Sequence, residues 1–275
     1  MRAVRRAQVR RANWEITAVG TVTLTLVGGP TVLIEAEGIR FLTDPTFDPP
    51  QSYDAGAVQL TKVTGPSVDP QSLLPVDCVL LSQDQHFDNL DHAGRAFLSQ
   101  AGRVLTTAAG AGRVGNNSVA LETWQSIEIS GRKSRNLRVT ASPARHGPKG
   151  IEPISGDVIG FVVTPEGANR RSIYVSGDTV WYEGVAEVAR RFDIGLAILF
   201  TGAARPRGAF RMTMDCNDAI EAAHAFADAK VITVHNEGWQ HFTEHQDELA
   251  HAFQVVGQAH RLYRLIRGVP LPLEL

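Results

Sequence analysis

The stretch LLSQDQHFDNLD, residues 80–91, decides how the rest of the sequence is interpreted. It begins as an apolar run, changes to a polar loop, and leads into a helix that we expect Asp91 to cap. Loops that follow a strand in this way often carry metal ligands, usually in the pattern His-x-His. Here Gln83 and Gln85 stand beside a single His86. The question is therefore whether this loop still binds a metal ion, and for which reaction.

The composition describes an ordinary globular protein. The chain has 275 residues, 43% of them hydrophobic and 20% charged, with enough apolar material for a sizeable core. A formal net charge of -2 argues neither for nor against a polyanionic partner. The arginine cluster MRAVRRAQVRR could serve as a nucleic-acid or membrane-surface arm. We interpret residues 1–15 instead as a solvated basic leader, which is the more common kind of chain start. They do not form a secretory signal, because no apolar segment follows the arginines.

Two further features indicate a cytoplasmic protein without a membrane segment. No stretch approaches the ~18 apolar residues of a spanning helix. Cys78 and Cys216 are too few for a disulfide framework, so we expect both thiols to be reduced and buried.

Short β-rich runs and helical segments fill residues 16–275 without a linker or a repeat, which predicts a single α/β domain. Runs such as VTLTLVGG, VDCVLLS, LETWQSIEI and KVITVH predict strands. The Ala-rich segment NDAIEAAHAFADA predicts a helix capped by Asn217 or Asp218. The letters TEHQ predict a capping box at Thr243. The helix that follows is expected to bury Leu249, Phe253 and Val256.

His or Asp side chains follow four separate predicted strands. The loop after VLLS contains His86 and Asp88, and the later strands are followed by His146, Asp178 and His235. These residue types bind zinc, manganese and iron. One histidine after a strand is usually only hydrogen-bonded, and it is the coincidence at four strand ends that indicates a metal site.

The order of these motifs resembles the metallo-β-lactamase-fold superfamily and, within it, the ascorbate-phosphate lactonase-like hydrolases. The resemblance runs from about residue 22 to residue 244. It rests on GGPTVLIEAEGIRFLTDPTFDP, LLSQDQHFDNLD, TASPARHGP, YVSGDTVWYEGV and VHNEGWQHFTE. It implies an αββα sandwich of two mixed β-sheets flanked by helices, with one or two metal ions at the sheet edge. It also implies a metal-bound hydroxide that attacks an ester, lactone, amide or phosphodiester.

The resemblance assigns roles residue by residue. His146 corresponds to the histidine of the third strand, Asp178 to the metal-bridging carboxylate and His235 to the last histidine. Asp88 corresponds to the aspartate that opens the helix. Asp44, in LTDP, resembles a carboxylate that supports the ligands from behind; a simple Asp-Pro turn explains it equally well.

The ligand loop departs from the usual His-x-His-x-Asp-His. If Ser82 is kept in place, Gln83 and Gln85 stand where the first two histidines belong, with one extra residue before Asp88. If Asp88 is kept in place, Asp84 and His86 take those positions. Both alignments put Asn89 where a further histidine is expected, and we favour the first because it needs no gap in the strand.

This departure predicts impaired or single-metal binding. A glutamine oxygen is a weak, hard donor, whereas a neutral imidazole is a good ligand for zinc. With Gln83 and Gln85 in ligand positions, one metal pocket keeps only His146 and Asp178. The other keeps Asp88, Asp178 and His235, with His86 as a further candidate. The expected cofactor is Zn²⁺ or Mn²⁺, as one or two ions.

The working hypothesis is metal-assisted hydrolysis of a small molecule. Asp88 is expected to orient the nucleophile or accept its proton. His241 is a candidate for contacting the leaving group or stabilising the oxyanion. Its alternative role is a local hydrogen bond at the start of a helix.

Several further side chains are weaker candidates for contacting the substrate. The aromatic candidates for pocket walls are Trp181, Tyr182 and Trp239. The candidates for binding an anionic group are Arg205 and Arg207, for which simple surface exposure is the other explanation.

A hypothesis of a different kind is that the protein is not an enzyme. In that case it is a non-catalytic member of the family that binds a ligand or a partner in the former active-site pocket. Gln83, Gln85 and Asn89 favour it, whereas the intact His146, Asp178 and His235 count against it. A nuclease acting through the arginine leader is the weakest of the hypotheses, so a nucleic-acid partner is not expected. A homo-oligomer is compatible with the sequence.

Overall fold

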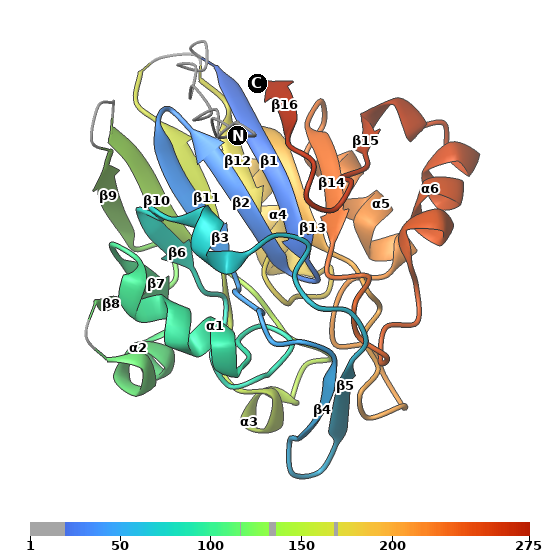
Figure 1. The fold of residues 1–275 in the computed structure, drawn as a ribbon. Helices are drawn as coiled ribbons and strands as arrows, with labels where there is room; N and C mark the ends of the chain where they lie inside the picture. The colour runs from blue at the N-terminus through green and yellow to red at the C-terminus, as the bar shows by residue number, and fades with distance from the viewer. Residues whose placement is uncertain (1–19, 116, 132–135, 168–169) are drawn as a thin grey trace, which may run out of the picture.

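Two seven-stranded β-sheets, formed by the described residues, pack face to face in this computed structural model (Figure 1). The structure describes residues 20–115, 117–131, 136–167 and 170–275. The predicted leader at residues 1–15 lies outside the described residues and stays a prediction, as does the single domain over residues 16–275.

The first sheet has the strand order β16-β1-β2-β3-β6-β7-β8. Its β16-β1-β2-β3 part is antiparallel, and its β3-β6-β7-β8 part is parallel. The strands are β1 (Thr21–Gly28), β2 (Thr31–Ala36), β3 (Ile39–Thr43), β6 (Cys78–Leu80), β7 (Val104–Thr106), β8 (Ser118–Ala120) and β16 (Leu271–Glu274).

The second sheet has the order β15-β14-β13-β12-β11-β10-β9 and the same division. Strands β9 to β12 pair antiparallel, and β12 to β15 pair parallel. The strands are β9 (Ser126–Ser130), β10 (Asn136–Pro143), β11 (Ile159–Pro165), β12 (Ser172–Val175), β13 (Ile194–Phe200), β14 (Lys230–Val234) and β15 (Leu262–Tyr263). Both sheets are mixed, as predicted.

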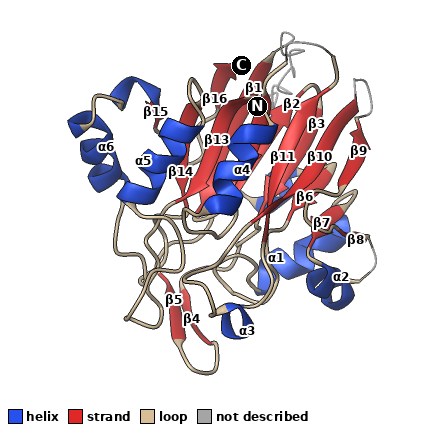
Figure 2. Cartoon of the chain, turned by 180° about the vertical axis from the view of Figure 1, so that it is seen from behind, coloured by secondary structure: helices blue, strands red, loops and turns tan. Residues whose placement is uncertain are grey.

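Helices cover the outer face of each sheet, which completes the predicted αββα sandwich (Figures 1 and 2). One apolar cluster fills the space between the sheets, and two others lie under the helices. The first sheet carries α1 (His92–Phe97), η2 (Leu98–Gln100) and α2 (Ala108–Val114). The second carries α4 (Glu183–Arg191), α5 (Cys216–Ala225) and α6 (Gln246–Val255). The remaining short elements are η1 (Pro70–Leu73), α3 (Glu152–Ser155) and η3 (Ala259–Arg261).

Several local predictions are wrong in detail. Strand β9 begins at Ser126, because Trp124 in LETWQSIEI has a left-handed backbone with φ of 70°. Asp215, rather than Asn217 or Asp218, caps α5 by accepting a hydrogen bond from the backbone N–H of Asp218. Cys216 is only partly buried, whereas Cys78 is fully buried as predicted.

The last helix also differs from its prediction. It begins at Gln246 rather than at Thr243, and the carboxylate of Glu248 accepts from the backbone N–H of His245. Gln246 therefore does not reach back to Thr243; its Oε1 accepts from Thr233 instead. In the predicted stripe Leu249 and Phe253 are buried, but Val256 lies beyond the helix and is 41% exposed.

A two-stranded hairpin that the sequence analysis did not predict projects from the end of the sandwich (Figure 1). It consists of β4 (Gln51–Asp54) and β5 (Gln59–Lys62). The carboxylate of Asp91 anchors it by accepting from Lys62 Nζ at 2.7 Å. The same carboxylate accepts from the backbone N–H groups of Phe47, Asp48 and Gly94. Asp91 thus caps α1, as predicted, and also joins the hairpin to the loop of residues 82–91.

Removing the charge of Asp91 should destabilise the protein strongly. Lys62 is 3% exposed, and an Asp91→Asn substitution leaves its buried ammonium group without its ion-pair partner. Breaking one partner of a buried ion pair costs about 3–5 kcal/mol in the free energy of unfolding, measured by denaturant titration. Asp54→Asn in the same hairpin, where the carboxylate is exposed, is the matched control and should stay within ~0.5 kcal/mol of the parent. Equal losses in the two variants would contradict this account of the hairpin.

Candidate metal centre

The side chains singled out by sequence meet at one end of the sandwich. Asp44 follows β3, the loop of residues 82–91 follows β6, and His146 follows β10. Asp178 follows β12 and His235 follows β14. These two strands lie on either side of β13 in the parallel part of the second sheet. Parallel strands end at the same edge, and this is why residues far apart in the chain converge.

Asp88, Asp178 and His235 form one group of potential ligands, with ligand atoms within 4.8 Å of one another. All three side chains are buried. His235 Nδ1 lies 2.9 Å from Asp178 Oδ1, and His235 Nε2 lies 3.5 Å from Asp88 Oδ2. The imidazole thus lies between two carboxylates. Its backbone is left-handed, with φ of 56°, and its N–H donates to the carbonyl of Gly29, which holds this strained conformation.

The polar atoms of this group suit a cation. Both ring nitrogens of His235 and Oδ1 of Asp178 are buried and are not aligned for any hydrogen bond. Burial alone would lower the pKa of His235, but the carboxylates of Asp178 and Asp88 outweigh it and raise that pKa to about 10. Positive charge is therefore favoured at this point. An imidazole and two carboxylates are also a donor set that divalent metals accept, so the residues fit a metal ion.

His86, His146 and Asp178 form a second such group among the described residues. The rings of His86 and His146 are 5.0 Å apart between centroids. His146 Nδ1 lies 2.9 Å from the carbonyl oxygen of Met212. Because a carbonyl only accepts, Nδ1 carries the proton and the lone pair is on Nε2. Burial lowers the pKa of His146 to about 4, which keeps this imidazole neutral.

Gln83 lies between the two groups. Its Nε2 donates to Asp178 Oδ2 at 2.7 Å and to Asn89 Oδ1 at 3.0 Å. Its Oε1 accepts from Gln85 Nε2 at 2.9 Å. Gln83 therefore contacts the expected bridging carboxylate, as the alignment on Ser82 places it, but it does so through an N–H group.

Gln85 does not take the place of the second histidine. Its amide donates to the carbonyl oxygens of Ser155 and Asp157, away from the histidines. His86 comes together with His146 instead, as the alignment on Asp88 places it. Asp84 also points away, into an ion pair with Arg113. Gln83 therefore lies where the alignment on Ser82 expects a ligand, and His86 lies where the alignment on Asp88 expects one, so the register of the loop stays a prediction.

Asp44 binds the ligand loop at two points. Its carboxylate accepts from the backbone N–H of Ser82 at 2.6 Å, from the Ser82 hydroxyl at 2.7 Å and from Asn89 Nδ2 at 3.3 Å. Burial raises the pKa of Asp44 to about 7, although the hydrogen bonds from Ser82 favour the ionised form. Asn89, at the expected position of a further histidine, is thus turned toward Asp44 and Gln83.

His241 reaches the site from the loop after β14. Its Nε2 lies 3.0 Å from Asp88 Oδ2, and its Nδ1 is buried without a hydrogen-bond partner. Neighbouring His235 and His241 outweigh the effect of burial and hold the pKa of Asp88 well below its usual range. The carboxylate that could orient a nucleophile is therefore ionised.

A pocket of about 340 Å³ opens at these residues. His86, Asp88, His146 and His241 line its polar side. Its apolar side includes Ala55, Val58 and Leu60 of the hairpin, Phe87, Ile154, Ala204 and Met212. Arg207 also lines it, whereas Arg205 and Trp181 line a different pocket. Trp239, a predicted wall residue, is buried against Tyr53 and lines neither pocket.

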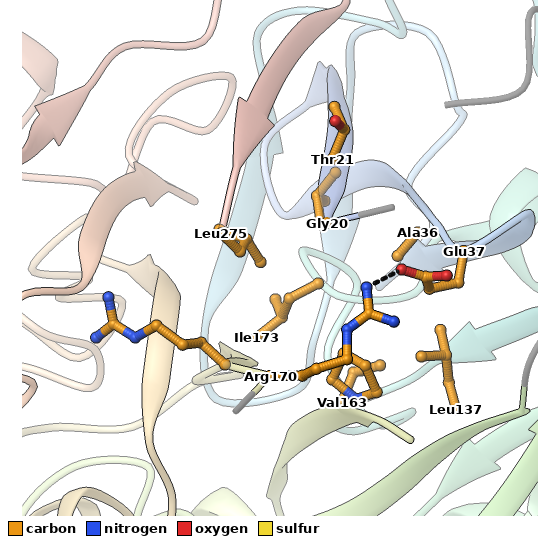
Figure 3. A pocket seen from close by; sticks show the side chains of 12 residues that line it. Gly20, Thr21, Ala36, Glu37, Leu137, Val163, Arg170, Ile173 and Leu275 are labelled. Atoms are coloured by element: carbon orange, nitrogen blue, oxygen red, sulfur yellow. Dashed lines mark hydrogen bonds and ion pairs between the residues drawn. The ribbon is translucent and has the colours of Figure 1, made fainter. Parts of the chain in front are cut away.

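A smaller cavity of about 180 Å³ lies at the opposite end of the strands (Figure 3). It is bounded by the start of β1, the end of β2 and the start of β12. Arg170 and Glu37 form an ion pair of 2.5 Å there. Its one acidic lining residue, Glu37, is engaged by Arg170, and the lining contains no His, Cys or Asp, so this cavity offers no cluster of metal ligands.

Sequence reasoning missed the groups that orient the ligand loop. Arg113 lies in α2, which was not predicted, and the acceptors from Ser155, Asp157 and Met212 are backbone carbonyls. Backbone acceptors leave no mark in the sequence. The alternation of Asp84 with two glutamines was the one available signal that this loop bulges.

The family model of the beta-lactamase superfamily domain matches residues 39–236. The chain belongs to this superfamily. It is similar to UPF0173 protein YddR of Bacillus subtilis (strain 168), with 21% identity over 238 residues, 83% of this chain and 91% of that protein. The predicted superfamily and fold are thereby confirmed. The lactonase-like branch stays a prediction.

Solved structures show the same fold. An isothiocyanate hydrolase from Delia radicum gut bacteria has a TM-score of 0.78 at 22% identity, covering 92% of this chain and 100% of that one. A possible metal-dependent hydrolase from Veillonella parvula DSM 2008 has a TM-score of 0.80 at 20% identity, covering 93% and 100%. In the described part of this superfamily member, no helix is both long and apolar enough to cross a membrane.

Removing the carboxylate of Asp44 should loosen the ligand loop. Asp44→Ala leaves three buried donor groups of Ser82 and Asn89 without their acceptor. An unsatisfied buried donor costs about 1–3 kcal/mol, so we expect the free energy of unfolding to fall by at least ~2 kcal/mol in metal-free buffer. Asp44→Asn keeps the shape and one acceptor oxygen and should lose less. A loss of less than ~0.5 kcal/mol in the alanine variant would contradict this account of Asp44.

Proposed function

We propose that the chain is a metal-dependent hydrolase that uses one divalent ion, held by Asp88, Asp178 and His235. The observation that carries this proposal is the convergence of these three buried side chains, with Asp178 Oδ1 and both nitrogens of His235 left without hydrogen bonds. Zn²⁺ or Mn²⁺ suits the donor set of one imidazole and two carboxylates.

The orientation of two amides supports one ion rather than two. Gln85 Nε2 faces the carbonyl oxygens of Ser155 and Asp157, which fixes which end of its amide points there. That nitrogen also faces Gln83 Oε1, so the N–H group of Gln83 is the end that faces Asp178. An N–H group cannot bind a metal, and it occupies the Asp178 oxygen that a second ion, at His86 and His146, would need.

The residues around the pocket divide the chemistry between them. When bound, the ion polarises a carbonyl or phosphoryl oxygen and lowers the pKa of its water from about 15.7 towards ~7. Asp88, ionised and held by His241, would orient the attacking water through a hydrogen bond. His241 lines the pocket beside Asp88 and would contact the leaving group. His86 and His146 line the same pocket and contact the substrate oxygens.

The pocket supports a small-molecule substrate. Its volume of about 340 Å³ lies at the low end for ligand sites, and one wall is apolar. An ester, lactone, amide or phosphodiester with a compact apolar group fits these walls, and the lactonase-like branch falls within this range. The free thiols of Cys78 and Cys216 are consistent with a cytoplasmic enzyme.

Metal content tests the one-ion proposal. The purified protein, loaded with Zn²⁺ or Mn²⁺ and analysed by plasma emission spectrometry, should hold about one ion per chain. Gln83→His replaces the N–H donor beside Asp178 with an imidazole and should raise the content to about two. Gln85→His is the matched control: it should stay at one, because that side chain faces carbonyl oxygens.

The other outcomes are equally informative. Two ions in the parent protein would refute the role given to Gln83. No ion in the parent protein would leave the non-catalytic, ligand- or partner-binding member as the better description. A second ion gained only with Gln85→His would show that position 85, rather than position 83, faces the second ion.

A substrate screen tests hydrolysis itself. Lactones, aryl esters, amides and phosphodiesters should include at least one class that the metal-loaded protein turns over. Asp178→Asn removes a charge that contacts both ligand groups. We expect it to lower kcat/KM by more than the ~10–100-fold typical of residues that only support a ligand. Asp193→Asn, an exposed aspartate, is the control and should have the parent rate. Stoichiometric metal with no turnover of any class would contradict the enzymatic proposal.

A further inference from the structure

A second pocket, of about 350 Å³, shares a segment of chain with the catalytic pocket but no lining residue. Within residues 204–212, one set of side chains lines the catalytic pocket: Ala204, Pro206, Arg207 and Met212. The other set lines the second pocket: Arg205, Ala209, Phe210 and Arg211. The segment therefore separates two spaces of different character.

The second pocket carries an excess of positive charge. Arg145, Arg205 and Arg211 line it, against one acid, Asp218. Arg211 pairs with Asp215. Among the described residues, no carboxylate lies within ion-pair distance of Arg145 or Arg205, so two guanidinium groups are left for a ligand. Guanidinium groups bind phosphate and carboxylate through paired N–H donors.

Flat side chains lie beside these charges. Trp181 and Phe210 contribute to the same lining. The guanidinium of Arg145 lies 4.5 Å from the ring centroid of Tyr182, and its Nε donates to the carbonyl of Gly147, so its orientation is fixed before a ligand arrives. An aromatic wall next to oriented cations suits a planar ring that carries an anionic group.

We propose that this pocket binds a small planar anion, an aromatic ring bearing phosphate or carboxylate, separately from the substrate. The absence of a shared lining residue is the reason for a separate ligand. The pocket is also joined to the metal centre. Arg145 directly precedes His146, and its backbone N–H and carbonyl bond to Thr179 and Val180, which follow Asp178.

Isothermal titration calorimetry of phenyl phosphate binding to the metal-free protein tests the proposal without requiring hydrolysis or a metal. The parent protein should bind it. Arg205→Gln should weaken binding about fivefold or more. Arg207→Gln is the matched control, since Arg207 is two residues away, equally exposed and on the other pocket. It should leave the affinity unchanged.

A second variant tests the recognition of the ring. Trp181→Leu should weaken the binding of phenyl phosphate about threefold or more and leave the binding of inorganic phosphate unchanged. Thermal melting checks that each variant is folded.

Three results would overturn the proposal. One is no binding of phenyl phosphate to the parent protein. Another is a loss of affinity for phenyl phosphate in Arg207→Gln as large as that in Arg205→Gln. This result would place the anion in the catalytic pocket or on the general surface. The third is an equal loss of affinity for phenyl phosphate and for inorganic phosphate in the Trp181→Leu variant, which would mean that the pocket does not recognise a ring.

Discussion

Asp178 lies between two groups of histidines, and its two carboxylate oxygens face different partners. Oδ1 lies 2.9 Å from His235 Nδ1, whereas Oδ2 accepts from Gln83 Nε2 at 2.7 Å. A bridging carboxylate must offer one oxygen to each of two ions. Because a hydrogen-bond donor and a cation compete for the same lone pairs, the contact with Gln83 makes the two positions unequal. The proposal of a single ion depends on that one contact.

Two buried aspartates hold the loop that delivers Gln83. Asp44 binds its first part through Ser82 and its middle through Asn89, and Asp91 binds its end to α1 and to the hairpin. Each carboxylate accepts several donors, so neither can move without leaving buried N–H groups unsatisfied. The loop therefore keeps its shape although its ligands differ from the usual pattern. The hairpin held by Lys62 and Asp91 also forms the apolar wall of the pocket.

The convergence of Asp88, Asp178 and His235 could be predicted from sequence because it depends on strand ends, which hydrophobic patterns reveal. The register of the loop could not, because spacing alone does not show which residue is the extra one. The contacts that bear on it are not visible in the sequence: Asp84 is drawn to Arg113, and Gln85 to carbonyl oxygens near α3. The hairpin was missed because QSYD and QLTK are short and polar, with the apolar side facing the site. Trp124 broke a strand through its backbone conformation, which no propensity of the side chain indicates.

The distribution of unsatisfied polar atoms distinguishes a modified metal site from a decayed one. A loop that lost its ligands without compensation would leave buried amides and carboxylates without partners. Within residues 82–91 no buried side-chain nitrogen or oxygen lacks a hydrogen bond, and the departures Gln83 and Asn89 bind each other. At the pocket, the buried atoms that form no hydrogen bond are Asp178 Oδ1, both nitrogens of His235, Nδ1 of His241 and Oγ of Ser155. Buried polar groups are rarely left unpaired in native proteins. Three of these five atoms belong to two side chains of one potential ligand group, and a fourth belongs to the histidine that contacts Asp88, so most of them gather at one of the two groups.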